Sequence, residues 1–143
     1  MSWYVFMASD SKLKSVSNSK CLWDGELEIN PSSLLGTGHG VRSYGYIDNF
    51  TKREYISSIN FYYTHERAQQ LISYIADHLE TSDKIELWSI LLDDTEDVPV
   101  EFIRCKLNDL AEAHIENFLR DRWRDSESGH RIFVPICLEI EKS

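Results

Sequence analysis

The fold is decided by residues 55–80, which read YISSINFYYTHERAQQLISYIADHLE. Residues 55–63 are rich in aromatic and β-branched side chains, with Ile59, Phe61 and Tyr63 on one face, and this pattern predicts a strand. Thr64 has the side chain of a helix N-cap. The residues after it place apolar side chains at a spacing of 3.6 residues as far as Glu80, which predicts an amphipathic helix.

Four more elements follow this strand and helix. Residues 84–92 are apolar on both faces, which is typical of a strand covered on both sides. A strand over 100–107, a helix capped by Asn108 and a last strand over 132–140 come next. The resulting β-α-β-β-α-β order over about residues 55–141 predicts an α+β fold with a ferredoxin-like βαββαβ core. In that fold, two helices pack on one face of an antiparallel sheet.

The first 54 residues add strands and a loop to this core. Strands are indicated at residues 3–9, 27–29 and 40–47, and a glycine-rich loop at residues 36–40. We expect these strands to extend the sheet or to cover its open face, within a single domain over residues 1–143. Pro135 lacks an N–H for a ladder bond and belongs at a sheet edge or a bulge. We therefore expect the last strand to lie at an edge of the sheet, unless another segment of the chain pairs with it.

The net charge is concentrated in one part of the chain. The chain has 24 acidic and 15 basic side chains, a formal charge of −9. Residues 77–116 hold twelve of the acids and only three of the bases, so this segment accounts for the whole net charge. Such an acidic balance argues against nucleic acid or an anionic membrane as the main partner. The sequence leaves open whether the acids form one patch or two.

Cysteine usage and hydropathy indicate a cytoplasmic protein. Cys21, Cys105 and Cys137 are odd in number and widely spaced, as expected of buried thiols in a reducing compartment. The first ten residues have no basic region and only a short apolar run, so we expect no secretory leader. No run of residues approaches the roughly 18 apolar residues that a membrane span needs.

Motifs for catalysis or cofactor binding are absent from the sequence. The five histidines and three cysteines show no metal-ligand spacing. The glycine-rich loop precedes an expected strand, whereas phosphate-binding loops follow a strand and open a helix. We therefore expect no catalytic residue, no metal and no cofactor.

These observations favour a non-catalytic, acidic protein-binding module. Proteins that bind nucleic acid, such as toxic nucleases, need positive active sites, and an acidic inhibitor complements them. We therefore expect a cytoplasmic inhibitor or immunity protein that neutralises a basic toxin. The expected partner-binding residues are the acidic run between two strands, the first acid of the next strand and one aromatic anchor: Asp93, Asp94, Glu96, Asp97, Glu101 and Trp123.

A small-molecule site or weak enzyme is the alternative hypothesis. Its pocket would lie near residues 36–46, between the N-terminal segment and the sheet. The polar side chains available there are those of His39, Arg42, Tyr44 and Tyr46. Homodimerisation through a sheet edge or face is compatible with either hypothesis.

Overall fold

The computed structural model describes residues 2–14, 16, 28–31, 51, 53–60, 63–92, 99–119, 123–125, 127, 129 and 131–143. The elements before the first helix are β1 (Ser2–Ser9), β2 (Glu28–Pro31) and β3 (Tyr55–Asn60). Those from that helix onward are α2 (His65–His78), β4 (Lys84–Leu92), β5 (Glu101–Lys106), the 3-10 turn η1 (Leu107–Asp109), α3 (Glu112–Leu119), β6 (Trp123–Asp125), β7 (Arg131–Phe133) and β8 (Ile136–Glu141). The protein is therefore of the α+β class, as predicted.

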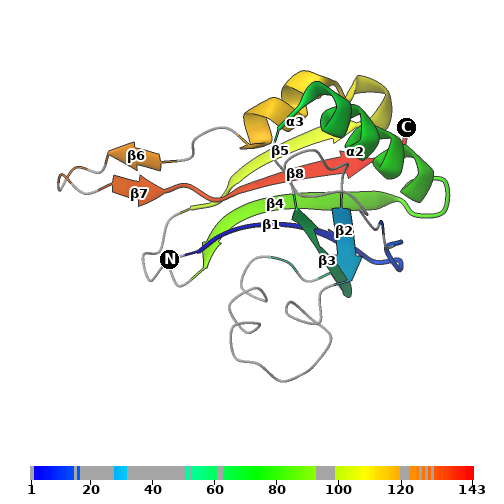
Figure 1. Cartoon of the computed structure of the whole chain (residues 1–143), viewed down its shortest axis with the longest axis horizontal. Helices are drawn as coiled ribbons and strands as arrows, with labels where there is room; N and C mark the ends of the chain where they lie inside the picture. Colours follow the sequence, from blue (N-terminus) through cyan, green and yellow to red (C-terminus); the bar gives the residue numbers. More distant parts are fainter. Residues whose placement is uncertain are drawn as a thin grey trace.

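The main sheet has six strands in the order β2-β3-β1-β4-β8-β5 (Figure 1). Neighbouring strands are antiparallel except for β5 and β8, which are parallel. β6 and β7 form a separate two-stranded antiparallel sheet. The first and last strands of the expected core, β3 and β8, both lie in the main sheet.

The ferredoxin-like strand order is not confirmed. Residues 55–141 supply the expected order of elements, with the β6–β7 hairpin inserted before β8. In a ferredoxin-like sheet, β5 would lie between β3 and β4. Here β1 takes that place, while β5 lies at the sheet edge beside β8.

Side-chain chemistry explains this difference. β1 has apolar side chains on both faces, and Val5, Phe6, Met7 and Ala8 are all buried. A strand with that composition suits the interior of a sheet. β5 alternates partly buried side chains with exposed ones, and charged exposed side chains are typical of an edge.

The last strand is not at an edge of the sheet, because β8 pairs on both sides, with β4 and with β5. Pro135 comes directly before β8, so its missing N–H removes no bond from the β4–β8 ladder. Its carbonyl oxygen accepts a hydrogen bond from the Glu101 N–H, 2.9 Å away. Proline therefore marks the start of β8 and not the border of the sheet.

The two faces of the sheet bury different sets of side chains. Ala68, Leu71 and Ile75 of α2 and Ile115 and Phe118 of α3 belong to one cluster, together with alternate residues of β1, β4 and β8. The opposite face has a smaller cluster, formed by Phe6, Ala8, Ile56, Trp88, Ile90 and Cys137. The period of two along each strand thus separates a helix-covered face from a second face.

The start of α2 agrees with the sequence prediction, and the start of α3 does not. The Thr64 side chain accepts a hydrogen bond from the Arg67 N–H, so the predicted N-cap of α2 is confirmed. α3 begins at Glu112, four residues later than Asn108, because residues 107–109 form a 3-10 turn first.

Candidate functional site

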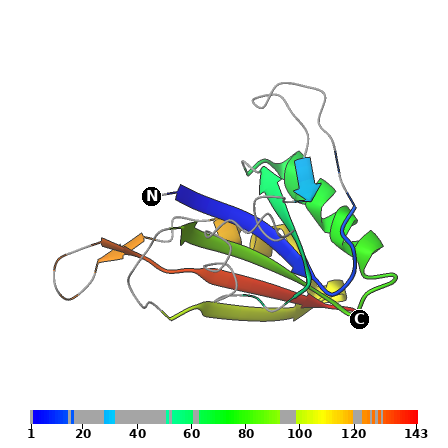
Figure 2. The same cartoon turned by 90° about the horizontal axis from the view of Figure 1, so that it is seen from below.

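A projecting hairpin marks one end of the molecule. β6 and β7 extend beyond the end of the main sheet (Figures 1 and 2). The partly exposed Trp123 packs edge-on against Phe133, with ring centroids 5.6 Å apart. The Arg131 guanidinium lies 5.9 Å from the centre of the Trp123 ring. Because a two-stranded hairpin alone is marginally stable, this stack of three side chains contributes to holding it in place.

The connection between β4 and β5 begins and ends at the same end of the molecule. Ser89 near the end of β4 and Glu101 at the start of β5 both lie level with Ile136 of β8. The bond from the Glu101 N–H to Pro135 ties the start of β5 to the base of the hairpin. The exposed Glu101 and the partly exposed Trp123, both expected to contact a partner, are therefore at one end.

The remaining expected contacts lie outside the described residues. These are the acidic run Asp93, Asp94, Glu96 and Asp97, which follows β4 in the sequence. The same holds for the expected ligand-binding side chains His39, Arg42, Tyr44 and Tyr46.

The described acids occupy more than one place on the surface. Asp77, Glu80 and Asp83 are exposed and lie at the end of α2 and just before β4. Glu101 lies at the other end of the sheet, because β4 starts level with Lys106 and ends beyond Glu101. The acidic segment therefore contributes at least two separate groups of carboxylates.

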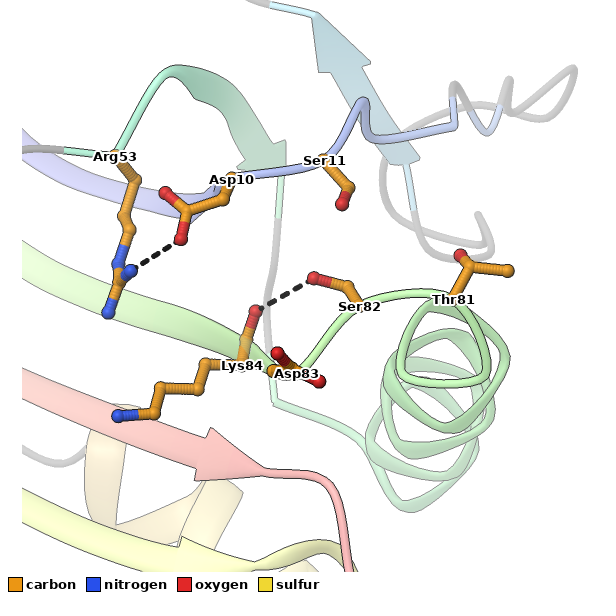
Figure 3. Close-up of a pocket in the computed structure, with 7 residues that line it drawn as sticks. All are labelled: Asp10, Ser11, Arg53, Thr81, Ser82, Asp83 and Lys84. Atoms are coloured by element: carbon orange, nitrogen blue, oxygen red, sulfur yellow. Dashed lines mark hydrogen bonds and ion pairs between the residues drawn. The ribbon is translucent and has the colours of Figure 1, made fainter.

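A polar pocket of about 350 Å³ lies at the end of the sheet opposite the hairpin (Figure 3). It is lined by the two residues after β1, by Arg53 two residues before β3, and by the α2–β4 connection with the first residue of β4: Asp10, Ser11, Arg53, Thr81, Ser82, Asp83 and Lys84. The Arg53 guanidinium is 2.6 Å from an Asp10 carboxylate oxygen. The Lys84 ammonium lies 3.5–3.7 Å from Glu141 and Glu139.

These ion pairs decide what the pocket can bind. Both cations in its lining already have carboxylate partners, so an anion would compete with the protein's own acids. The Ser11 hydroxyl remains, while the Thr81 hydroxyl donates a long bond to the His78 carbonyl oxygen, 3.4 Å away. The pocket therefore suits water or a small polar molecule. It has no apolar wall of the kind that usually encloses an organic ligand.

A buried carboxylate lies behind the pocket, and sequence reasoning missed it. The Glu86 side chain accepts hydrogen bonds from Thr51 (2.7 Å), the Trp88 indole N–H (2.8 Å) and Arg53 (3.1 Å). Buried carboxylates need such partners because desolvation of the charge is costly. The signal available in the sequence was one glutamate in residues 85–92, where Ser89 is the only other polar side chain.

A second polar cluster joins the starts of α2 and α3. Glu112 accepts a hydrogen bond from the Tyr63 hydroxyl, lies 2.7 Å from His65 Nδ1 and accepts a longer bond from Gln69. The bond to Glu112 raises the pKa of Tyr63 to about 12. It also lowers the pKa of Glu112. These groups are exposed, and their arrangement connects the two helices at the surface.

The two described cysteines are not activated. Burial raises the pKa of the Cys105 thiol and, more strongly, that of the Cys137 thiol, so both remain protonated near neutral pH. Among the residues that the structure describes, no group of three or more His, Cys, Asp or Glu side chains is arranged to hold a metal ion.

Comparison with protein families, curated proteins and solved structures finds no match to this chain. Of the helices in the described part of the chain, none is long and apolar enough to cross a bilayer.

Proposed function

We propose that the chain is a non-catalytic module that binds a basic protein through the end of the molecule with the hairpin. The supporting observation is that the β6–β7 hairpin stands outside the main sheet at the end where the β4–β5 connection begins and ends. That connection contains the acidic run Asp93, Asp94, Glu96 and Asp97.

The two parts of this surface supply different contributions to binding. Trp123 is held between Phe133 and Arg131, and tryptophan and arginine are the residues most often found at binding hot spots. The acidic run attracts a cationic partner over a distance and raises the association rate by about 10–10³-fold at low salt. We expect the partner to be a cytoplasmic toxin with a positive active site, such as a nuclease, which the bound chain blocks.

Charge reversal and aromatic truncation test this proposal. The chain is immobilised, the basic protein that it captures from its native source is purified, and association is measured at low and at physiological salt. We expect Asp94→Lys with Asp97→Lys to slow association several-fold at low salt and much less at high salt. We expect Trp123→Ala to increase the dissociation rate at either salt concentration.

Matched controls lie at the opposite end of the sheet. Tyr55, which is 37% exposed and level with Ser9, provides the control Tyr55→Ala. Glu80, exposed after α2, provides the charge control Glu80→Lys. If these controls reduce binding as much as the hairpin-end variants do, the proposed surface is wrong. Association that does not depend on salt would reject the electrostatic part of the proposal.

A further inference from the structure

The outer edge of β5 is an unused hydrogen-bonding surface. β5 is the last strand of the main sheet and pairs with β8 along one edge only. Within the described part of the chain, no element pairs with its other edge, which follows the outer margin of the sheet in Figure 2. An edge strand with free N–H and C=O groups is a template for another strand.

The register shows which backbone groups are free. The Glu101 N–H donates to Pro135 on the β8 side, and the backbone direction alternates along a strand. Residues 101, 103 and 105 therefore direct their N–H and C=O groups toward β8. Phe102, Arg104 and Lys106 direct theirs toward the open edge.

The side chains of Phe102, Arg104 and Lys106 favour pairing more than an edge strand with unpaired charges would. Phe102 is 58% exposed and packs edge-on against Trp88, with ring centroids 5.9 Å apart. Arg104 and Lys106 would normally discourage edge pairing. Here they lie 3.8 Å from Glu139 and 3.0 Å from Glu141, so carboxylates on β8 offset their charges.

We propose that β5 pairs antiparallel with β5 of a second copy of this chain, about a two-fold axis at Ile103. Antiparallel partners exchange both bonds between residues that face each other across the edge. Phe102 then pairs with Arg104 of the second copy, and Arg104 with its Phe102, which gives about four main-chain hydrogen bonds. Each guanidinium lies beside an aromatic ring, an attractive contact.

Two neighbouring registers fit less well. An axis at Arg104 would place the two arginines opposite each other, and like charges in that position are destabilising. An axis at Phe102 would leave only residues 101–103 of each strand paired. Ile103 is partly buried against the helix-side core, so the favoured axis also brings two apolar side chains together.

Charge supports a second copy as the occupant. β5 contains Glu101, Arg104 and Lys106 and is slightly positive, although the chain as a whole has a charge of −9. Two acidic chains can therefore meet at β5 without bringing acids together. Of the expected toxin contacts, only Glu101 belongs to β5, whereas Trp123 and the acidic run lie outside the strand that pairs.

The first test uses two substitutions that remove the same charge. Arg104→Pro deletes the outward N–H, which a proline at an edge can do without breaking the β8 ladder. Arg104→Ala retains that N–H. By sedimentation equilibrium we expect dimers for the natural chain and for Arg104→Ala. For Arg104→Pro we expect a dissociation constant at least about tenfold higher than for Arg104→Ala. A monomeric natural chain, or equal dimerisation of the two folded variants, overturns the proposal.

Disulfide cross-linking tests the register and does not depend on the proline variant folding. In the favoured register the Cα atoms of the two Ile103 residues face each other about 4.5 Å apart, a Cα–Cα distance that a disulfide can span. Under mild oxidation, Ile103→Cys should form a dimer linked through residue 103, identified by peptide mapping. Phe102→Cys should not, because its opposite neighbour is Arg104. The reverse result, or no cross-linking of either variant, overturns the proposal.

Discussion

At the scale of single residues, the buried Glu86 carboxylate depends on several hydrogen-bond donors. Its carboxylate accepts hydrogen bonds from Thr51 and Arg53, which lie 35 and 33 positions earlier in the chain, and from Trp88, two positions later on the same strand. Glu86→Gln retains the shape but replaces one acceptor oxygen by an N–H₂ group, although the Arg53 guanidinium and the Trp88 indole N–H can only donate. We expect the free energy of unfolding in urea to fall by about 1–3 kcal/mol. The control Glu80→Gln, at an exposed position, should change it by less than about 0.5 kcal/mol. Equal effects would mean that the Glu86 bonds add nothing.

His78 gives the protein a pH dependence that can be isolated. Its Nε2 lies 2.6 Å from the buried Ser9 hydroxyl, and burial lowers the pKa of the imidazole below 6.5. The folded state therefore binds fewer protons than the unfolded state, so stability decreases as the pH falls below 6.5. Glu112 and Glu141 have lowered pKa values, so their contribution is lost only below about pH 4.5. We expect His78→Gln to reduce the stability difference between pH 7.5 and 5.5, measured by urea unfolding. An unchanged difference would contradict this assignment.

At the scale of elements, the local sequence pattern predicted most strands and helices, but it did not predict which strands lie next to one another in the sheet. The cap at Thr64 and the apolar spacing after it define α2, alternation defines β8, and short runs that are apolar on both faces define β1 and β4. The position of β1 inside the sheet depends on competition between strands that are far apart in sequence. β1 is apolar on both faces, so it displaces the charged β5 to the edge. Comparing the two strands by charge would have indicated this order.

The candidate surface was predictable in the same limited way. Charge counting located the acidic segment in the sequence, and hot-spot composition led us to expect a contact at Trp123. The separate hairpin that carries Trp123 was not predicted. β6 and β7 have three residues each, too short for a periodic signal. The Glu86 and Glu112 clusters depend on side chains 33–49 positions apart, which no local pattern reveals.

At the scale of the whole molecule, the proposed function has a cost in stability. Crowding the full charge of −9 into residues 77–116 causes self-repulsion that a partner, but not the free chain, can relieve. The reversal Asp94→Lys with Asp97→Lys should therefore raise the free energy of unfolding at about 10 mM salt by some tenths of a kcal/mol, up to about 1 kcal/mol. Half-molar salt should remove most of the gain, since the Debye length falls from about 30 Å to a few ångströms.

A second reversal with the same net charge separates this local effect from a general one. Asp125→Lys with Glu127→Lys changes the hairpin, where Asp125 faces Arg131 and the surrounding sequence is electrically balanced. We expect no gain in stability from it, because the lysine at position 125 would face Arg131 and neither position lies in the acidic segment. Urea unfolding of both variants at two salt concentrations measures the difference. If both variants gain equally, net charge alone causes the repulsion, and the placement of the acids has no energetic cost that partner binding would need to explain.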